Sequence, residues 1–153
     1  MAETLNPYHL IGQDQTRRYW ESLIRSGRFG HAHILSGHSG VGKDAMALTI
    51  GTILNCKAEN NKPCGECSAC RQMQNFEHPA LHLIFALPRR SPSQTDPFAG
   101  IKDGEMTLIN EELSKKVKWP YYHLQVDGAN DIRIAAIRKL RKDIYLAHDP
   151  GNT

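Results

Sequence analysis

The chain has 153 residues, of which 40% are hydrophobic and 23% charged, so its composition allows one ordinary globular domain with a real core. The net charge of +3 is too small to require a nucleic-acid partner and does not exclude one. Neither an apolar run long enough to cross a membrane nor a signal peptide at residues 1–7 is present, which predicts a cytoplasmic protein.

The first predicted element is a helix that begins at Asp14, an N-cap residue, and ends at Gly27. Its apolar side chains recur at helical spacing: Tyr19, Trp20, Leu23 and Ile24. A short strand is predicted at residues 33–35. A second helix is predicted from about Gly42 to Asn55, and its composition suits burial against a sheet.

The second half of the chain continues with an apolar strand at residues 82–87, a loop at 88–100 and a polar helix at 107–118. An alternating strand is predicted at 121–127, followed by a helix capped by Asp131. We expect that helix to bury one broad apolar face: Ile132, Ala136, Ile137, Leu140 and Ile144. Its basic side is interpreted as a solvated face: Arg133, Arg138, Lys139, Arg141 and Lys142.

This alternation of strands and helices predicts an α/β fold with a parallel sheet. Only two or three strands are found, and no apolar run ends in the paired acids that would hold Mg²⁺ and orient a water molecule. We therefore expect the first part of a larger domain, followed by turn-forming residues at 148–153.

The segment between the first strand and the second helix has the spacing of a phosphate-binding P-loop, a glycine, four residues and then Gly-Lys. Glycines let backbone N–H groups approach phosphate oxygens, the helix start adds its own N–H groups, and the lysine supplies a full charge. The predicted cofactor-binding residues are Gly37, His38, Ser39, Gly40, Val41, Gly42, Lys43 and Asp44. The alternative is a glycine-rich turn without a ligand.

Asp44 departs from the P-loop pattern, which has Ser or Thr after the lysine to ligate Mg²⁺. A carboxylate can also ligate Mg²⁺, but it repels a phosphate about 4 Å away by roughly 4 kcal/mol at an effective dielectric constant near 20. We therefore interpret the loop as shaped for phosphate rather than tuned for fast hydrolysis. Any nucleotide affinity is expected to depend on Mg²⁺.

A cluster of four cysteines has the spacing C-x7-C-x2-C-x2-C: Cys56, Cys64, Cys67 and Cys70. Four thiolates that converge through tight turns suit tetrahedral Zn²⁺, and four protein ligands leave no open position for a substrate. The sequence therefore predicts a structural zinc site. An iron–sulfur cluster also uses closely spaced cysteines and remains the alternative.

The order of these motifs resembles the N-terminal ATPase-type domain of bacterial DNA polymerase III clamp-loader subunits, the gamma/tau and delta-prime group. The segments that carry the resemblance are Ile11–Gln13, Gly27–Ala32, Gly37–Lys43, Leu54–Cys56 and Pro63–Cys70. This group inserts a four-cysteine zinc module just after the P-loop helix. The resemblance covers residues 10–82 well and 121–148 loosely, and residues 86–120 have no counterpart.

The resemblance implies an AAA+ P-loop NTPase fold: a three-layer α/β sandwich with a parallel sheet, truncated to residues 1–153 and interrupted by the zinc module at 56–70. It implies a subunit of the sliding-clamp loader that binds nucleotide weakly or acts as a stator. Asp44 favours the delta-prime type over the alternative, an active gamma/tau-type ATPase. The implied ligands are structural Zn²⁺ and, at the loop, ATP with Mg²⁺.

The implied partners are other clamp-loader subunits, the sliding clamp and primer–template DNA, with no membrane. The residues 1–153 alone are expected to lack ATPase activity, because the family's acidic strand would lie beyond Thr153. Two remoter alternatives are a P-loop kinase and a zinc-knuckle nucleic-acid binder. A P-loop kinase lacks a recognisable acceptor site here, and a zinc-knuckle nucleic-acid binder lacks interleaved aromatic and basic residues near the cysteines.

Overall fold

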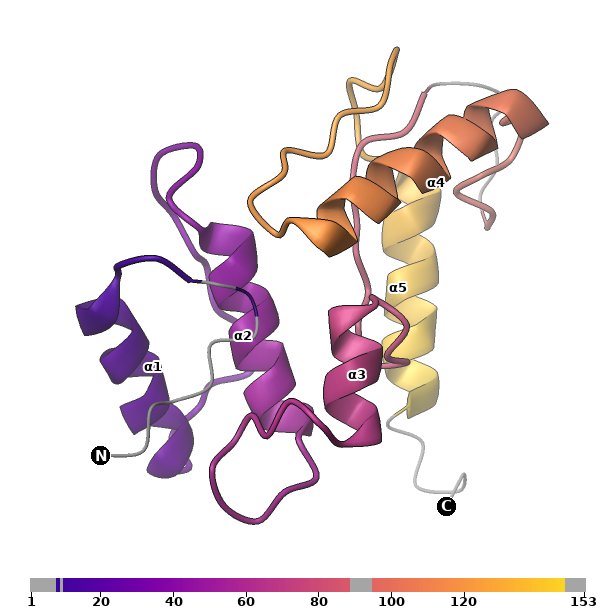
Figure 1. Cartoon of the computed structure of the whole chain (residues 1–153). Coiled ribbons are helices and arrows are strands. Elements are labelled where there is room, and N and C mark those ends of the chain that lie inside the picture. The colour runs from indigo at the N-terminus through magenta and orange to yellow at the C-terminus, as the bar shows by residue number, and fades with distance from the viewer. Residues whose placement is uncertain (1–7, 9, 89–94, 148–153) are drawn as a thin grey trace. The chain divides into compact units, whose positions relative to one another are not determined.

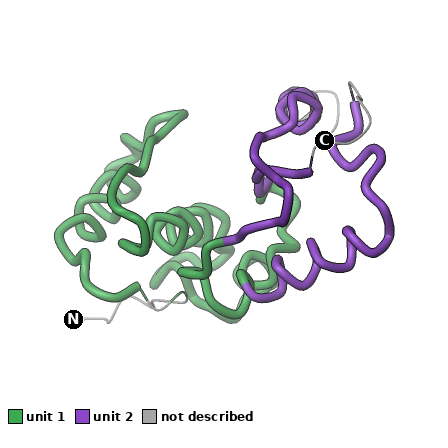
Figure 2. The backbone as a smooth tube through the Cα atoms, turned by 90° about the horizontal axis from the view of Figure 1, so that it is seen from above, with its two compact units in different colours: residues 1–81, 116–123 green, residues 82–115, 124–153 purple. Residues whose placement is uncertain are grey.

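The structure is a computed structural model that describes residue 8, residues 10–88 and residues 95–147. Within these residues the chain forms five helices (Figure 1): α1 (Asp14–Arg25), α2 (Lys43–Asn55), α3 (Ser68–Gln74), α4 (Asp103–Lys118) and α5 (Ile134–Ala147). The chain divides into two compact units (Figure 2). The first comprises residues 1–81 and 116–123, and the second comprises residues 82–115 and 124–153.

The predicted parallel sheet does not form in the described residues, so the expectation of an AAA+ three-layer sandwich was wrong. The segments predicted as strands, 33–35, 82–87 and 121–127, contain only one bridging residue, Leu87, which forms an isolated antiparallel bridge with Asp131. A strand exists through hydrogen bonds to a neighbouring strand, which an apolar pattern alone does not supply. Ile34, at the centre of the first predicted strand, is 92% exposed.

The first helix confirms the prediction for this region with one change at its start. Asp14 is the first helical residue rather than the cap, and Gln13 precedes it in a left-handed conformation. At the other end, the N–H of Gly27 donates to the carbonyl of Ile24, and the N–H of Arg28 donates to that of Leu23. This pair of bonds is a Schellman motif, which needs the positive φ that Gly27 adopts.

Helix α2 is the centre of the first unit and confirms the predicted second helix. It packs against α1 and more extensively against α3. Its buried side chains join a hydrophobic cluster with the N-terminal segment and α1: Tyr8, Leu10, Trp20, Ala45, Met46, Leu48 and Ile50. Because the helix is buried along most of its length, both of its ends are held firmly. The glycine loop enters at one end, and the first cysteine follows the other.

In the second unit, α4 begins at Asp103, four residues before the predicted start at residue 107. The Glu105 carboxylate accepts the N–H of Lys102 at this end, a contact that the apolar periodicity did not reveal. Helix α5 is also present, but its predicted apolar face is not buried. Ala136 is buried, whereas Ile132, Ile137 and Ile144 are 45% to 51% exposed.

Arg133 was predicted to lie on a solvated basic face, and the structure places it differently. Its guanidinium donates to three backbone carbonyl oxygens, those of Pro88, Pro97 and Ala99. The arginine therefore ties the turn before α5 to the segment before α4. The other four basic residues follow the prediction: Arg138, Lys139, Arg141 and Lys142 are exposed.

Three predictions concern residues that lie wholly or partly outside the described part of the chain: the missing signal peptide at 1–7, the part of the 88–100 loop at 89–94, and the turn at 148–153. Among the helices that are described, none has the length and apolar character needed to span a membrane.

Candidate functional site

The four cysteines predicted as metal ligands come together in the first unit. Their sulfur atoms all lie within 4.8 Å of one another, and the sulfurs of Cys64 and Cys70 are 3.9 Å apart. Four Zn–S bonds of about 2.3 Å in a tetrahedron require sulfur–sulfur separations of about 3.8 Å. The cysteines are not joined by disulfides. The cluster therefore has the ligand atoms and the spacing to hold one metal ion.

Backbone N–H groups point at the sulfur atoms of this cluster. The N–H of Cys64 donates to the sulfur of Cys56 at 3.4 Å, that of Cys67 to Cys64 at 3.4 Å, and that of Cys70 to Cys67 at 3.5 Å. Such bonds stabilise thiolates, the form that binds metal. The last of them also caps α3, so the short helix begins where the ligand loop ends.

The surroundings give the sulfurs different affinities for protons. Backbone N–H groups, that of Lys57 first and that of Cys70 next, lower the pKa of Cys67 to about 6. Burial raises the pKa of Cys70 to about 12. Burial also acts to raise the pKa of Cys56, but N–H groups of Cys64 and Ala58 outweigh it and leave that pKa below its usual value. Without metal the cluster therefore mixes thiol with thiolate, and a bound cation would displace the remaining protons.

The cysteine cluster rests on the buried end of α2. The Thr52 hydroxyl donates to the carbonyl of Leu48 at 2.7 Å, which uses its only proton. The Tyr8 hydroxyl, 3.0 Å from the Thr52 oxygen, must therefore be the donor of that bond. Cys70 and Thr52 are completely buried, and burial raises the pKa of the Tyr8 hydroxyl. These contacts fix the cysteine loop to the hydrophobic core.

The glycine loop lies at the opposite end of α2, and Lys43 holds it closed. The Lys43 ammonium donates to the carbonyl oxygens of Gly37 and His38 at 2.9 and 2.8 Å. An ammonium has three protons, so one remains for an anion at the loop. Within the loop, the N–H of Val41 donates to the carbonyl of His38. The segment thus forms a tight turn whose backbone closes on its own lysine.

Gly42 is required by two features of this turn. Its φ of 92° lies in the left-handed region that favours glycine. A Cβ built at this position would also lie 3.0 Å from a ring carbon of Tyr121. The Tyr121 hydroxyl in turn accepts the N–H of Ile11 at 3.0 Å, and its ring contacts that of Trp119. The aromatic segment 119–121 therefore packs directly against the start of α2.

Asp44 is paired with a lysine 72 positions away in the sequence. The Lys116 ammonium donates to the Asp44 carboxylate at 2.5 Å and to the carbonyl oxygens of Pro120 and Tyr122 at 2.7 Å each. Lys116 is only 4% exposed, whereas the Asp44 side chain is 64% exposed. All three protons of the ammonium are therefore engaged, and its charge balances that of Asp44.

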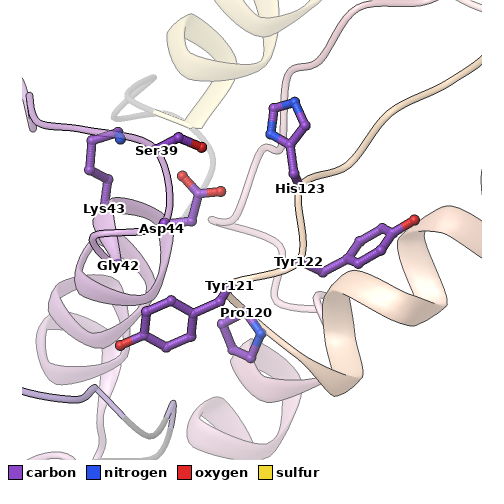
Figure 3. Close-up of a pocket in the computed structure, with 9 residues that line it drawn as sticks. Ser39, Gly42, Lys43, Asp44, Pro120, Tyr121, Tyr122 and His123 are labelled. Carbon is purple, nitrogen blue, oxygen red and sulfur yellow. The ribbon is translucent and has the colours of Figure 1, made fainter.

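The glycine loop with the start of α2 on one side, and residues 120–123 on the other, line a pocket of about 350 Å³ within the first unit (Figure 3). Its residues come from the glycine loop, the start of α2 and the segment after α4: Ser39, Gly40, Gly42, Lys43, Asp44, Pro120, Tyr121, Tyr122 and His123. Figure 3 shows the Asp44 carboxylate projecting from α2 on the side where residues 120–123 run. Of the eight predicted loop residues, Gly37, His38 and Val41 shape the turn, and the other five line the pocket.

Sequence reasoning missed the second wall of this pocket. Residues 121–127 were predicted as a strand, and Lys116 as one more polar residue of a helix. No local pattern links Lys116 to Asp44. One signal was available: Trp119-Pro120-Tyr121-Tyr122 is an aromatic run directly after a helix end, which marks a segment with something to pack against.

Comparison with known proteins assigns the chain to a family. The sequence model of the family described as DNA polymerase III, delta subunit, matches residues 12–150. The chain therefore belongs to this family, and the predicted resemblance to DNA polymerase III clamp-loader subunits is confirmed.

Relatives with curated names agree. DNA polymerase III subunit delta' of Bacillus subtilis is 30% identical over 103 residues, which are 67% of this chain and 28% of the relative. The delta' subunit of Yersinia pestis is 25% identical over 151 residues, 95% of this chain and 42% of the relative. The tau subunit of Bacillus subtilis is 31% identical over 95 residues, which are 61% of this chain and 16% of the relative. The chain thus spans less than half the length of these relatives. No solved structure matches it.

Proposed function

We propose that this chain acts as a subunit of the DNA polymerase III sliding-clamp loader, of the delta' type, and binds nucleotide weakly or serves as a stator. The observation that carries the proposal is the family match over residues 12–150, supported by delta' relatives from two organisms. The partners proposed for it are other clamp-loader subunits and, through the assembly, the sliding clamp and primer–template DNA.

The cysteine cluster is proposed to bind one structural Zn²⁺. The four sulfurs are spaced for one tetrahedral ion, and the backbone N–H groups around them favour thiolates. An iron–sulfur cluster distributes its thiolates over several irons, which a group of sulfurs this compact suits less well. Zinc when bound would supply folding energy, because its ligands join the end of α2 to α3. Metal analysis should find about one zinc per chain, lost in Cys64→Ser and kept in Ser68→Ala.

The glycine loop is proposed to bind the phosphate chain of a nucleotide. Lys43 retains a proton for an anion, the N-terminus of α2 opens into the pocket, and Ser39 and His123 add polar side chains. Asp44 is the carboxylate among the nine residues lining the pocket, and it is already paired. This arrangement supports binding more than hydrolysis, which needs groups that hold Mg²⁺ and orient water.

A second candidate is an active ATPase of the gamma/tau type, which the matches to tau subunits favour. The two candidates differ in turnover. A delta'-type chain should retain ATP intact. A gamma/tau-type chain, or the assembly containing it, should release phosphate in a reaction that depends on Lys43.

The proposed role is tested by assembly. The purified chain is mixed with the tau subunit of its own organism and analysed by size-exclusion chromatography with light scattering. Co-elution at a defined stoichiometry, unchanged in Lys139→Ala on the exposed side of α5, supports the proposal. Failure to associate at micromolar concentrations, with zinc present, would contradict it.

A further inference from the structure

The Asp44 carboxylate occupies the position at which a P-loop offers its Mg²⁺ ligand, so its surroundings decide whether it can play that part. Magnesium demands oxygen ligands at about 2.0–2.1 Å in near-octahedral geometry. In this chain the oxygen Oδ2 of Asp44 lies 2.5 Å from the Lys116 ammonium. A cation bound to this carboxylate would either displace the buried, fully hydrogen-bonded Lys116 ammonium or lie directly beside its positive charge. The residues present at this position do not suit Mg²⁺.

The contacts of the Lys116 ammonium keep it beside Asp44. Its side chain is 5% exposed and donates to the carbonyl oxygens of Pro120 and Tyr122, both in the wall of the pocket. Moving the ammonium away from Asp44 would bury it without its counter-charge or would break these two bonds. The pair therefore fixes the 120–123 segment to the start of α2. Asp44 acts as a positioning residue for the pocket.

From this geometry we propose that the pocket takes the phosphate chain as a metal-free polyanion, with Lys116 in place of Mg²⁺ as the cation that neutralises Asp44. The inference rests on the proposed nucleotide site and specifies the ionic form that the site accepts. It also revises the expectation that affinity depends on Mg²⁺. That expectation treated the Asp44 charge as uncompensated, and the ion pair compensates it.

The charges around the pocket give the sign of the effect of Mg²⁺ on ATP affinity. With Asp44 and Lys116 cancelling, the pocket presents Lys43 and the N-terminus of α2 to the ligand, which is a net positive field. Binding Mg²⁺ reduces the negative charge of ATP and so weakens its attraction to that field. ATP in EDTA should therefore bind as tightly as ATP with Mg²⁺, or up to about tenfold more tightly after solvent screening.

The test is the dissociation constant of ATP for the zinc-loaded 153-residue chain. It is measured by isothermal titration calorimetry in trace EDTA too dilute to strip the zinc, and again in excess Mg²⁺. Lys116→Met leaves the Asp44 charge uncompensated. We expect it to weaken binding about tenfold without Mg²⁺ and to recover part of the loss with Mg²⁺, so that Mg²⁺ strengthens binding in this variant, as it does not in the parent chain. Lys115→Met is the matched control, since Lys115 is 55% exposed, does not line the pocket and pairs with Glu112 within α4.

Two further variants keep the test decisive if Lys116→Met does not fold. In Asp44→Asn, ATP should bind more tightly with and without Mg²⁺, because a negative charge is removed. The ratio of the dissociation constants measured with and without Mg²⁺ should stay unchanged. The double variant Asp44→Asn with Lys116→Met should also bind independently of Mg²⁺.

One result would overturn the inference while the nucleotide site stands: ATP binding by the parent chain weakens tenfold or more when Mg²⁺ is removed, and Asp44→Asn abolishes this difference. That result would identify Asp44 as a metal ligand. No ATP binding in either condition would overturn both the inference and the proposed nucleotide site.

Discussion

The ion pair between Lys116 and Asp44 predicts an asymmetric effect on stability. In Lys116→Met the methylene stem is kept, but the carbonyl oxygens of Pro120 and Tyr122 lose a charged donor. A hydrogen bond to a charged group contributes about 1.5–3 kcal/mol. Asp44 is 64% exposed, so water replaces its partner at little cost. Because Tyr122 is only half-buried and its carbonyl can be rehydrated, we expect a loss of about 2–4 kcal/mol.

Asp44→Asn should cost somewhat less, about 1–3 kcal/mol, because Lys116 keeps both carbonyl oxygens and an amide oxygen but, buried as it is, loses its counter-charge. Lys115→Met removes the pair with Glu112 from a lysine that is 55% exposed, so we expect a smaller loss, of about 1 kcal/mol. The free energy of unfolding is obtained from urea denaturation of the zinc-loaded chain, and an unchanged slope with urea confirms that the same surface unfolds. If Lys116→Met lowers the free energy of unfolding no more than Lys115→Met does, the stabilising role of the buried Lys116 ammonium would be refuted.

Three further results are expected. In the metal-free chain at pH 7, iodoacetamide should alkylate Cys67 first, since its pKa near 6 makes it a thiolate. It should alkylate Cys70 last, since a pKa near 12 and burial keep that residue a thiol. Peptide mass spectrometry that finds the reverse order would contradict this assignment. The Cys67 pKa is lowered on folding, so its share of stability should be present at alkaline pH and lost as pH falls through about 6, which a series of thermal melts on the metal-free chain would measure. Gly42→Ala should lower stability by about 1–3 kcal/mol through its positive φ and the contact with Tyr121, whereas Gly104→Ala, in open space in α4, should not; equal melting temperatures for the two would argue against the packing described.

The sequence predicted α1 and α2 well because their signals are local, whereas α3 was not predicted and α5 begins at Ile134 rather than directly after Asp131. The apolar stripe of α1, the glycine that ends it and the long buried composition of α2 all lie within one element. The cysteine cluster was also predictable, since its short spacings bring the sulfurs together whatever the rest of the chain does. The strands were not, because pairing is a relation between distant segments. Residues 33–35 and 82–87 carry strand-like composition yet find no ladder in the described part of the chain.

The pocket shows the same division between local and distant information. The eight residues from Gly37 to Asp44 were identified from spacing alone, and the structure closes them around Lys43. The charge expected at this loop is different once Lys116 is found beside Asp44, because the ammonium balances the carboxylate. The motif therefore predicts a place for an anion, which remains a prediction. The charge balance of the site depended on a residue that no motif contains.

The most direct test of the account is equilibrium dialysis of radiolabelled ATP against the zinc-loaded chain and its Lys43→Ala variant, with the nucleotide analysed by chromatography afterwards. We expect that the parent chain retains ATP, that the ATP is recovered intact, and that Lys43→Ala loses at least about tenfold in affinity, because the lysine supplies the full charge of the loop. Retention that is equal in the two proteins, or ADP formed by the parent chain and not by Lys43→Ala, would contradict it.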